Sequence, residues 1–226
     1  MQSLIIAGGE GRRLRPLTYI EPKPMLRIGV YPFLEYLIRL LVKNKIKDIV
    51  LSTGYLGGQI KHYFQDGAYF GANIEYSHEV FSLGTGGALK LAEPLLDDNF
   101  FIINGDTYLD IDYQEAYKTF KMSNRLGMMV VKESEKANCR IDENYNLIQY
   151  RKNGIAKLYL DAGVWISNKR ILDYIPENKK ISLEEKILPN LIKEREIKTY
   201  ITDKQFYDIG TLEGLERFKK YIKTEE

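Results

Sequence analysis

The first 25 residues constrain the fold most, because they join a strand that is apolar on both faces to a glycine-rich turn. Residues 3–7 are almost continuously apolar, which is typical of a parallel strand covered by helices on each side. Gly8, Gly9 and Gly11 follow directly. Glycines let the backbone approach an anionic group and direct its N–H donors toward it. The segment therefore predicts an α/β fold with an anion site after the first strand.

A glycine loop after a strand serves turn geometry alone in many α/β proteins, but here cations accompany it at Arg12, Arg13, Arg15 and Lys23. Two better-known phosphate motifs are excluded. No G-x-x-x-x-G-K-[ST] sequence occurs, so the chain is not a P-loop NTPase. Leu14 stands where the dinucleotide fingerprint needs its third glycine. The segment reads instead as G-x-G-x-R-L-x-P-L-T, followed by P-K-P.

Composition limits the classes of protein that remain. The 226 residues, 44% of them hydrophobic, are enough for one α/β domain with an ample core. A net charge of +2 is too balanced for a dedicated nucleic-acid binder. The single Cys139 excludes an internal disulfide and a cysteine-based zinc site. Because no apolar stretch approaches the ~18 residues of a membrane span, we expect a soluble cytoplasmic protein that binds neither nucleic acid nor membrane.

Hydrophobic spacing predicts alternating strands and helices. A helix over residues 33–45 and a strand over 48–53 complete a βαβ unit with the first strand. The expected sheet is mostly parallel and doubly wound, of Rossmann-like type, with helices on both faces and ligands at the carboxyl ends of its strands. The other expected elements are strands at 73–76, 100–103, 127–132, 139–142 and 147–151, and helices starting near Gly86 and spanning 182–194 and 212–222.

Four further motifs follow the glycine loop, at residues 83–89 (LGTGGAL), 104–107 (NGDT), 161–165 (DAGVW) and 208–211 (DIGT). In this order, and over nearly the whole chain, the sequence resembles the sugar-1-phosphate nucleotidyltransferases, also called nucleotide-sugar pyrophosphorylases. Within that family it looks most like the short D-glycero-α-D-manno-heptose 1-phosphate guanylyltransferases.

The resemblance implies one catalytic domain over residues 1–226, with a nucleotide-binding half (1–124), a sugar-phosphate-binding half (125–226) and no β-helix extension. It implies transfer of a nucleoside monophosphate to a sugar 1-phosphate with release of pyrophosphate, GTP and the heptose 1-phosphate being favoured. Mannose-1-phosphate guanylyltransferase, a short uridylyl- or cytidylyltransferase with another phosphorylated acceptor, and an inactive regulatory homologue remain alternatives. A homodimer is compatible with the sequence, which does not fix the oligomeric state.

The family's catalytic and metal positions match residues of this chain. Arg13 would neutralise the triphosphate, and Lys23 the α-phosphate and the incoming oxygen. Asp106 follows the apolar strand at 100–103, and Asp208 lies in a second transition from apolar residues to glycine. Two carboxylates that leave room for phosphate and water suit Mg²⁺. Either aspartate alone would more often cap a turn, and Asp110 and Asp112 are expected to cap the next helix.

Glu79 is the residue expected to read the base. Glutamate is frequent at this position in guanylyltransferases of the family, and a carboxylate can accept both N1–H and N2–H₂ of guanine. A surface glutamate is the structural alternative. The glycines at 84–87 would let a flat base lie near the backbone. The other positions expected to bind the nucleotide are Ile5, Ala7, Gly8, Gly9, Gly11, Arg12, Gly84, Thr85 and Gly105.

The match is weaker on the acceptor side. Lys152 is expected to hold the sugar phosphate, whereas Arg151 replaces a glutamate that would accept hydrogen bonds from sugar hydroxyls. Asp161 takes over that role, or the acceptor carries an additional anionic group. A third interpretation turns Arg151 outward or pairs it with Asp161. The remaining positions expected to bind the sugar phosphate are Gly87, Gly163 and Glu184, although Glu184 could equally start a solvated helix capped by Ser182.

Overall fold

The structure is a computed structural model that describes residues 1–151 and 158–225. Its centre is a parallel group of strands. β1 (Gln2–Ile6) lies between β4 (Asp48–Thr53) and β6 (Asn99–Asn104), and β5 (Asn73–His78) pairs with the outer side of β4. Parallel pairing brings the carboxyl ends of these strands to one edge of the sheet, where the glycine loop begins.

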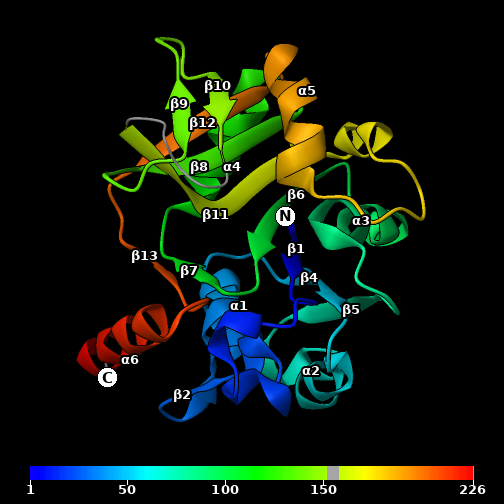
Figure 1. Cartoon of the computed structure of the whole chain (residues 1–226), viewed down its shortest axis with the longest axis vertical. Coiled ribbons are helices and arrows are strands. Elements are labelled where there is room, and N and C mark those ends of the chain that lie inside the picture. The colour runs from blue at the N-terminus through cyan, green and yellow to red at the C-terminus, as the bar shows by residue number, and fades with distance from the viewer. Residues whose placement is uncertain (152–157, 226) are drawn as a thin grey trace.

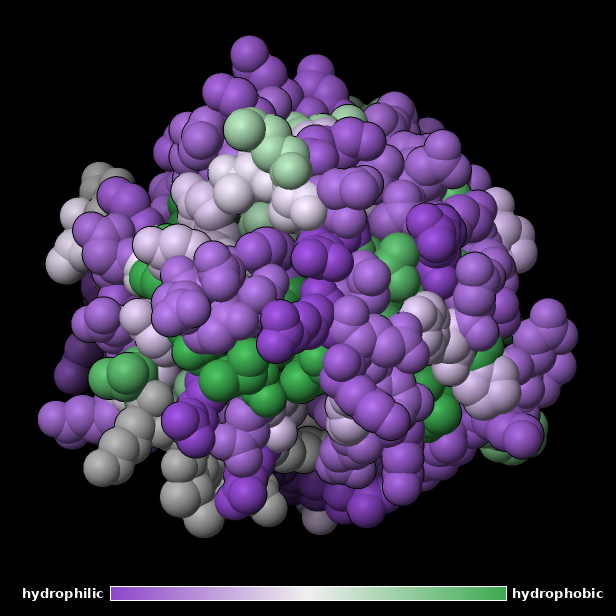
Figure 2. All heavy atoms as spheres, turned by 90° about the horizontal axis from the view of Figure 1, so that it is seen from above, coloured by the Kyte–Doolittle hydropathy of each residue, from purple (hydrophilic) through white to green (hydrophobic). Residues whose placement is uncertain are grey.

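The later strands extend the sheet in a mixed pattern. β11 pairs antiparallel with β6 and β8, whereas β12 pairs parallel with β8. In the described residues the main path is β10-β9-β11-β6-β1-β4-β5. Figure 1 shows these late strands at one end of the molecule, and Figure 2 shows that end as a mostly hydrophilic surface. Their bounds are Gly127–Ser134 (β8), Cys139–Ile141 (β9), Leu147–Tyr150 (β10), Leu158–Asn168 (β11) and Ile197–Thr202 (β12).

Helices cover both faces of the sheet, which confirms the predicted fold class. Leu4 and Ile5 of β1 are both fully buried, but they belong to different hydrophobic clusters. The cluster of Ile5 includes residues of α1 (Phe33–Lys43), α2 (Gly57–Phe64) and α4 (Tyr113–Ser123). The cluster of Leu4 includes residues of α3 (Gly84–Leu91) and α5 (Leu188–Lys193). A strand buried on both faces needs this continuous apolar sequence.

The single helix predicted over residues 182–194 is wrong in one respect. A π-helical turn, Leu183–Ile187, precedes α5. Pro189 lies in the first turn of α5. A proline has no backbone N–H to donate to the preceding turn, and its ring clashes with the carbonyl four residues earlier. The wider turn accommodates this ring. Of the two predicted caps, Asp112 caps α4 by accepting from Glu115 N at 2.9 Å, whereas Asp110 faces Lys43 at 3.8 Å.

Two small sheets and the last helix complete the described fold. β2 (Arg27–Ile28) pairs with β3 (Tyr31–Pro32), and β7 (Thr107–Leu109) pairs with β13 (Phe206–Asp208). α6 (Leu212–Glu225) packs on a third cluster and projects to one side in Figure 1. Within the described residues, no helix is both long and apolar enough to cross a membrane. The 3₁₀ turns are Arg12–Leu14, Leu17–Tyr19, Lys23–Met25, Ala68–Phe70, Glu93–Leu95 and Lys169–Tyr174.

Candidate functional site

The glycine loop leaves β1 at the carboxyl edge of the sheet. A Cβ on Gly8 would come within 2.6 Å of the Glu79 carboxylate, so glycine is required there for close packing. A Cβ on Gly9 would meet nothing within 4 Å, which leaves this backbone open to a ligand. Gly11 has φ +61°, and its carbonyl accepts from Thr18 Oγ1 at 3.0 Å. The loop is thus fixed at both ends with an open centre.

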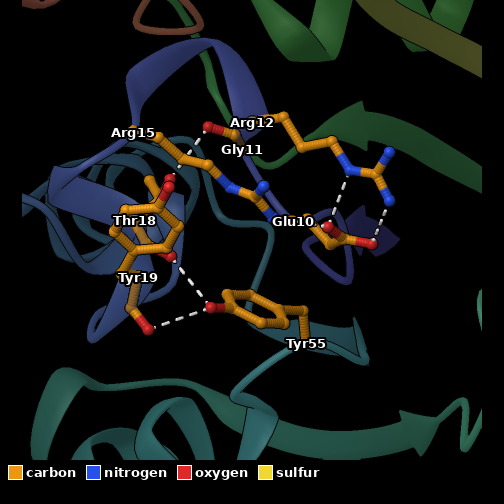
Figure 3. Close-up of polar contacts among 7 residues, drawn as sticks. All are labelled: Glu10, Gly11, Arg12, Arg15, Thr18, Tyr19 and Tyr55. Carbon is orange, nitrogen blue, oxygen red and sulfur yellow. Dashed lines mark hydrogen bonds and ion pairs between the residues drawn. The ribbon is translucent and has the colours of Figure 1, made fainter.

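Arg12 turns toward a residue that the sequence did not single out (Figure 3). It donates to both carboxylate oxygens of Glu10, at 2.8 and 2.9 Å, and Arg15 donates to the same carboxylate at 3.0 Å. These hydrogen bonds and charges lower the pKa of Glu10. The side chain of Arg12 is 73% exposed. Tyr55 holds the following turn by donating to the carbonyls of Thr18 and Tyr19.

The pairing of β7 with β13 brings the two predicted metal-binding aspartates together. Thr107 pairs with Asp208, and Ile209 N donates to the Asp106 carbonyl at 3.0 Å. Burial raises the pKa of Asp208, and the neighbouring Asp106 carboxylate raises it further. Lys23 forms an ion pair with Asp106. Two like charges held side by side with a cation nearby form a centre suited to charged ligands.

Arg13 reaches the same centre. A Cβ on Gly210 would lie 2.7 Å from Arg13 Nη2, 2.8 Å from Asp208 Oδ1 and 3.3 Å from Asp106 Oδ2. Gly210 N also donates to Asp208 Oδ1 at 2.6 Å. The glycine of the DIGT motif is therefore needed so that the arginine and both carboxylates can converge.

The pair of carboxylates fits a divalent cation of the Mg²⁺ type. The described residues contain no group of three or more His, Cys, Asp or Glu side chains placed to hold a metal. Mg²⁺ is usually bound through one or two carboxylates, and its other ligands are substrate phosphates and water. Asp106 and Asp208 supply that number of protein ligands, and burial disfavours leaving their two negative charges unneutralised.

Glu79 lies beneath the glycine loop and is only 8% exposed, so the surface-glutamate alternative is wrong. Oε2 accepts from Leu83 N at 2.9 Å, and Oε1 lies where a Cβ on Gly8 or Gly54 would approach it within 2.8 Å. Burial raises the pKa of Glu79, whereas the hydrogen bond from Leu83 and the charges of His78 and Lys180 lower it. One oxygen of this buried carboxylate is thus bonded to the protein backbone, and its role in reading a base remains a prediction.

The glycines of α3 contact protein as well as offering space. A Cβ on Gly84 would lie 2.6 Å from the Ile181 carbonyl, and one on Gly87 would lie 2.6 Å from the Lys179 carbonyl. Gly86 N donates to Ile181 O at 2.9 Å. These glycines allow residues 179–184, which we call the strap, to pack across the start of α3. Their contacts with a nucleotide or sugar remain predictions.

Thr85 and Glu184, predicted for opposite halves of the site, meet in this strap. Thr85 Oγ1 donates to Glu184 Oε2 at 2.7 Å and accepts from Leu183 N at 2.9 Å. Ser182 Oγ donates to the same carboxylate at 2.7 Å and accepts from Glu185 N at 3.2 Å. Ser182 is therefore the predicted helix cap, and Glu184 is also tied to α3.

A cavity of about 970 Å³ opens beside the aspartates, and we call it the central cavity. Its lining includes Arg13, Asp106 and Asp208 together with Asp161 and Gly163. Gly163 has φ +73°, and its missing side chain lets β11 pack against Thr107. The cavity thus extends from the two aspartates to positions predicted for the sugar phosphate.

Asp161 is hydrogen-bonded within this lining. Its carboxylate accepts from Gly163 N at 2.9 Å and from Trp165 Nε1 at 3.2 and 3.3 Å. Burial raises the pKa of Asp161 to about 6 despite these hydrogen bonds. Arg151 is exposed, and its Nε donates to the side-chain oxygen of Gln149 at 3.0 Å. Of the three interpretations of Arg151, the outward one agrees with this placement. Lys152 lies outside the described residues.

Three other predicted positions stabilise the backbone around the site. Ile5 is fully buried in the core, and Ala7 N donates to Ser52 O at 2.8 Å. A Cβ on Gly105 would lie 2.7 Å from Ile6 O, so this glycine keeps the turn before Asp106 close to β1. Sequence reasoning missed Glu10 and the strap. The three-residue strands β7 and β13 also escaped it, because such short strands carry little periodicity.

Comparison with known proteins places the chain in a family. Residues 2–225 match the family described as nucleotidyl transferase, and the chain belongs to it. It is 34% identical to the D-glycero-alpha-D-manno-heptose 1-phosphate guanylyltransferase of Aneurinibacillus thermoaerophilus, with 98% of each chain covered. It is 30% identical to the mannose-1-phosphate guanylyltransferase of Mycobacterium tuberculosis, over 96% of this chain and 63% of that one.

A solved structure agrees. HddC from Yersinia pseudotuberculosis, complexed with GMP-PN, superposes with a TM-score of 0.84 at 26% sequence identity, covering 98% of this chain and 99% of that one. The predicted family and fold class are thereby confirmed. The chain is a sugar-1-phosphate nucleotidyltransferase, and homologues of its kind act on a nucleoside triphosphate and a sugar 1-phosphate.

Proposed function

We propose that this enzyme transfers GMP from GTP to a sugar 1-phosphate, with D-glycero-α-D-manno-heptose 1-phosphate as the favoured acceptor, and releases pyrophosphate. The convergence of Arg13, Lys23, Asp106 and Asp208 beside the open glycine loop carries the proposal. The heptose 1-phosphate guanylyltransferase at 34% identity supports the choice of substrates. Mannose 1-phosphate is the second candidate acceptor, supported by the mannose-1-phosphate guanylyltransferase relative.

The reaction needs positioning and charge stabilisation more than a covalent nucleophile. The acceptor's phosphate oxygen attacks the α-phosphorus in line and displaces pyrophosphate, so no side chain forms a bond to the substrate. Arg13 stabilises the charge that gathers on the leaving pyrophosphate. Lys23 lies beside Asp106 and stabilises the α-phosphate as the bond forms. Lys152 is proposed to hold the acceptor phosphate.

We propose Mg²⁺ as the metal, bound by Asp106 and Asp208. When bound, it would neutralise phosphate charge and polarise the α-phosphate oxygens. The two carboxylates hold their positions through the β7–β13 pairing and the Gly210 N–H, so the centre is organised by the protein itself. The Gly210 N–H, Lys23 and Arg13 all act against the repulsion between the two carboxylates by lowering the pKa of Asp208.

Glu79 is proposed to select guanine. Its position between the glycine loop and Leu83 presents a carboxylate oxygen to a base lying over the loop. A carboxylate accepts from both N1–H and N2–H₂ of guanine, whereas uracil and cytosine lack that pair of donors. Because GTP is a metabolite of the cell interior, we also propose a cytoplasmic location. Assembly as a homodimer stays a prediction.

A substrate matrix tests the proposal. Purified enzyme is incubated with each nucleoside triphosphate against a panel of sugar 1-phosphates, with and without Mg²⁺, and pyrophosphate release is measured. We expect the highest kcat/KM for GTP with the heptose 1-phosphate and no turnover after chelation. Higher kcat/KM with UTP or CTP would contradict the choice of base. If no combination releases pyrophosphate, the result would favour the alternative that the chain is an inactive regulatory homologue.

A further inference from the structure

The glycine loop carries a carboxylate in the middle of the predicted anion site. Glu10 stands between Gly9, whose backbone is open to a ligand, and Gly11. A carboxylate at this place repels the phosphates expected there unless cations neutralise it. Arg12 donates to it at 2.8 and 2.9 Å, and Arg15 donates to it at 3.0 Å. Two arginines therefore share one carboxylate, and the group of three side chains stays positively charged.

The hydrogen bonds of Arg12 determine which part of its guanidinium is left for a ligand. Nε donates to Oε2 of Glu10, and Nη2 donates to Oε1. A guanidinium has five N–H donors in a planar fork. Glu10 takes the side of the fork that combines Nε and Nη2, so the end that combines Nη1 and Nη2 faces away from the carboxylate. That end matches a second bidentate anion such as a phosphate, and the Arg12 side chain is 73% exposed.

A chain of contacts fixes Glu10 itself (Figure 3). Arg15 links the Glu10 carboxylate to the next turn, because its guanidinium carbon lies 5.1 Å from the centre of the Tyr19 ring. Tyr55 holds that turn by donating to the Tyr19 carbonyl at 3.0 Å. The carboxylate is therefore bonded on one side to an anchored arginine and on the other side to Arg12.

We propose that Glu10 is a positioning residue for nucleotide binding, which holds the Arg12 guanidinium so that its open end binds the terminal phosphates of the nucleoside triphosphate. This inference rests on the proposed function, because it takes the triphosphate to lie along the glycine loop. Arg13 reaches the two aspartates, where the α-phosphate is transferred, so the β- and γ-phosphates fall to the neighbouring arginine. An arginine that is already ordered loses less conformational entropy when its ligand binds.

A double-mutant cycle between Glu10→Gln and Arg12→Ala tests this dependence. Without a sugar 1-phosphate the proposed transfer cannot proceed, so calorimetry with GTP and Mg²⁺ gives a Kd directly. We expect Arg12→Ala to raise the Kd for GTP about two- to tenfold more when Glu10 is present than in the Glu10→Gln background. The cycle removes the direct repulsion between Glu10 and the phosphates from the comparison, because that repulsion acts with and without Arg12.

Two controls separate positioning from a general effect on structure or charge. GMP lacks the terminal phosphates, so neither substitution should change its Kd by more than about twofold. A purely structural role of Glu10 would alter the binding of GMP and GTP together. Glu216→Gln removes another exposed carboxylate, which accepts from Lys219 at 2.8 Å on α6. This variant should keep the Kd for GTP within about twofold of the unaltered enzyme.

The outcomes separate the inference from the function on which it rests. Equal effects of Arg12→Ala in the two backgrounds would overturn the inference. A larger effect in the Glu10→Gln background would show that Glu10 competes with the phosphates for Arg12, which overturns it as well. Both results leave pyrophosphate release by the unaltered enzyme, and with it the proposed function, standing.

If no combination of substrates releases pyrophosphate, the proposed function fails, and the same cycle with inorganic tripolyphosphate decides the inference. A coupling of the expected size between Glu10 and Arg12 would support it. Binding of tripolyphosphate without such a coupling, or no binding at all, would overturn it.

Discussion

Asp161→Asn should change how the free energy of unfolding depends on pH. Burial raises the pKa of Asp161 from its ordinary 3.8 to about 6 in the folded protein. Between these values the folded state binds more protons than the unfolded state, so this residue stabilises the fold at low pH and the contribution is lost as pH rises through 6. Linkage gives a loss of about 2 kcal/mol between about pH 4.5 and about pH 7.5. Asparagine does not titrate and should remove this dependence.

The measurement uses the chain's single tryptophan. Trp165 Nε1 donates to Asp161, so its fluorescence follows both urea unfolding and the local charge. The difference in unfolding free energy between the unaltered protein and Asp161→Asn should fall by about 2 kcal/mol over that pH interval. Fluorescence of the folded protein should titrate near pH 6 only when Asp161 is present. A difference that stays constant with pH would refute the raised pKa and the buried position from which it follows.

Four other predictions concern the proposed metal centre, the proposed base site and the strap. Asp106→Ala should lower kcat by orders of magnitude in a folded protein, and near-normal pyrophosphate release would contradict the metal assignment. Lys23→Ala should reduce kcat more than it raises the KM for GTP; a rise in KM alone would make Lys23 a uniform binding contact. Glu79→Gln should cut kcat/KM for GTP at least roughly tenfold and narrow the gap to UTP, and an unchanged ranking of bases would exclude its role. Gly87→Ala should lower the free energy of unfolding by about 1–3 kcal/mol, because its Cβ would lie 2.6 Å from the strap. Gly58→Ala, which has open space around it, should raise the free energy of unfolding by up to about 1 kcal/mol. Equal effects of the two variants in urea unfolding would show that the strap moves to accommodate the added methyl group.

The central strands could be predicted because their sequence has one dominant requirement. β1 is buried on both faces, so Leu4 and Ile5 both had to be apolar, and the glycines after them had few structural alternatives. The βαβ unit followed from the spacing of apolar residues in α1. These features depend on local sequence and on burial alone.

The relative placement of the two aspartates could not be predicted from the residues. Asp106 and Asp208 are brought together by β7 and β13, each three residues long and far apart in the chain. Such strands are too short for a period of two to be recognised, and only the family resemblance paired the aspartates.

The glycines after Glu79 have a packing role that their sequence alone did not indicate. A glycine indicates that something approaches the backbone, but the sequence does not say whether a ligand or another segment does so. Here Ile181 and Lys179 approach Gly84 and Gly87. A base that binds near these glycines must therefore contact the strap as well, or lie on the exposed side of α3.

The strap also joins the two ends of the proposed site. At one end, the hydrogen bond from Arg12 lowers the pKa of Glu10 and the charge of Lys180 lowers it further, whereas burial raises the pKa of Glu79 and Lys180 acts against that rise. At the other end, burial raises the pKa values of Tyr150 and Asp161 in the central cavity, and the charge of Glu184 raises them further. Thr85 fixes the strap to α3 between these charges. We therefore expect a substitution that displaces the strap to alter the KM of both proposed substrates, GTP and the sugar 1-phosphate.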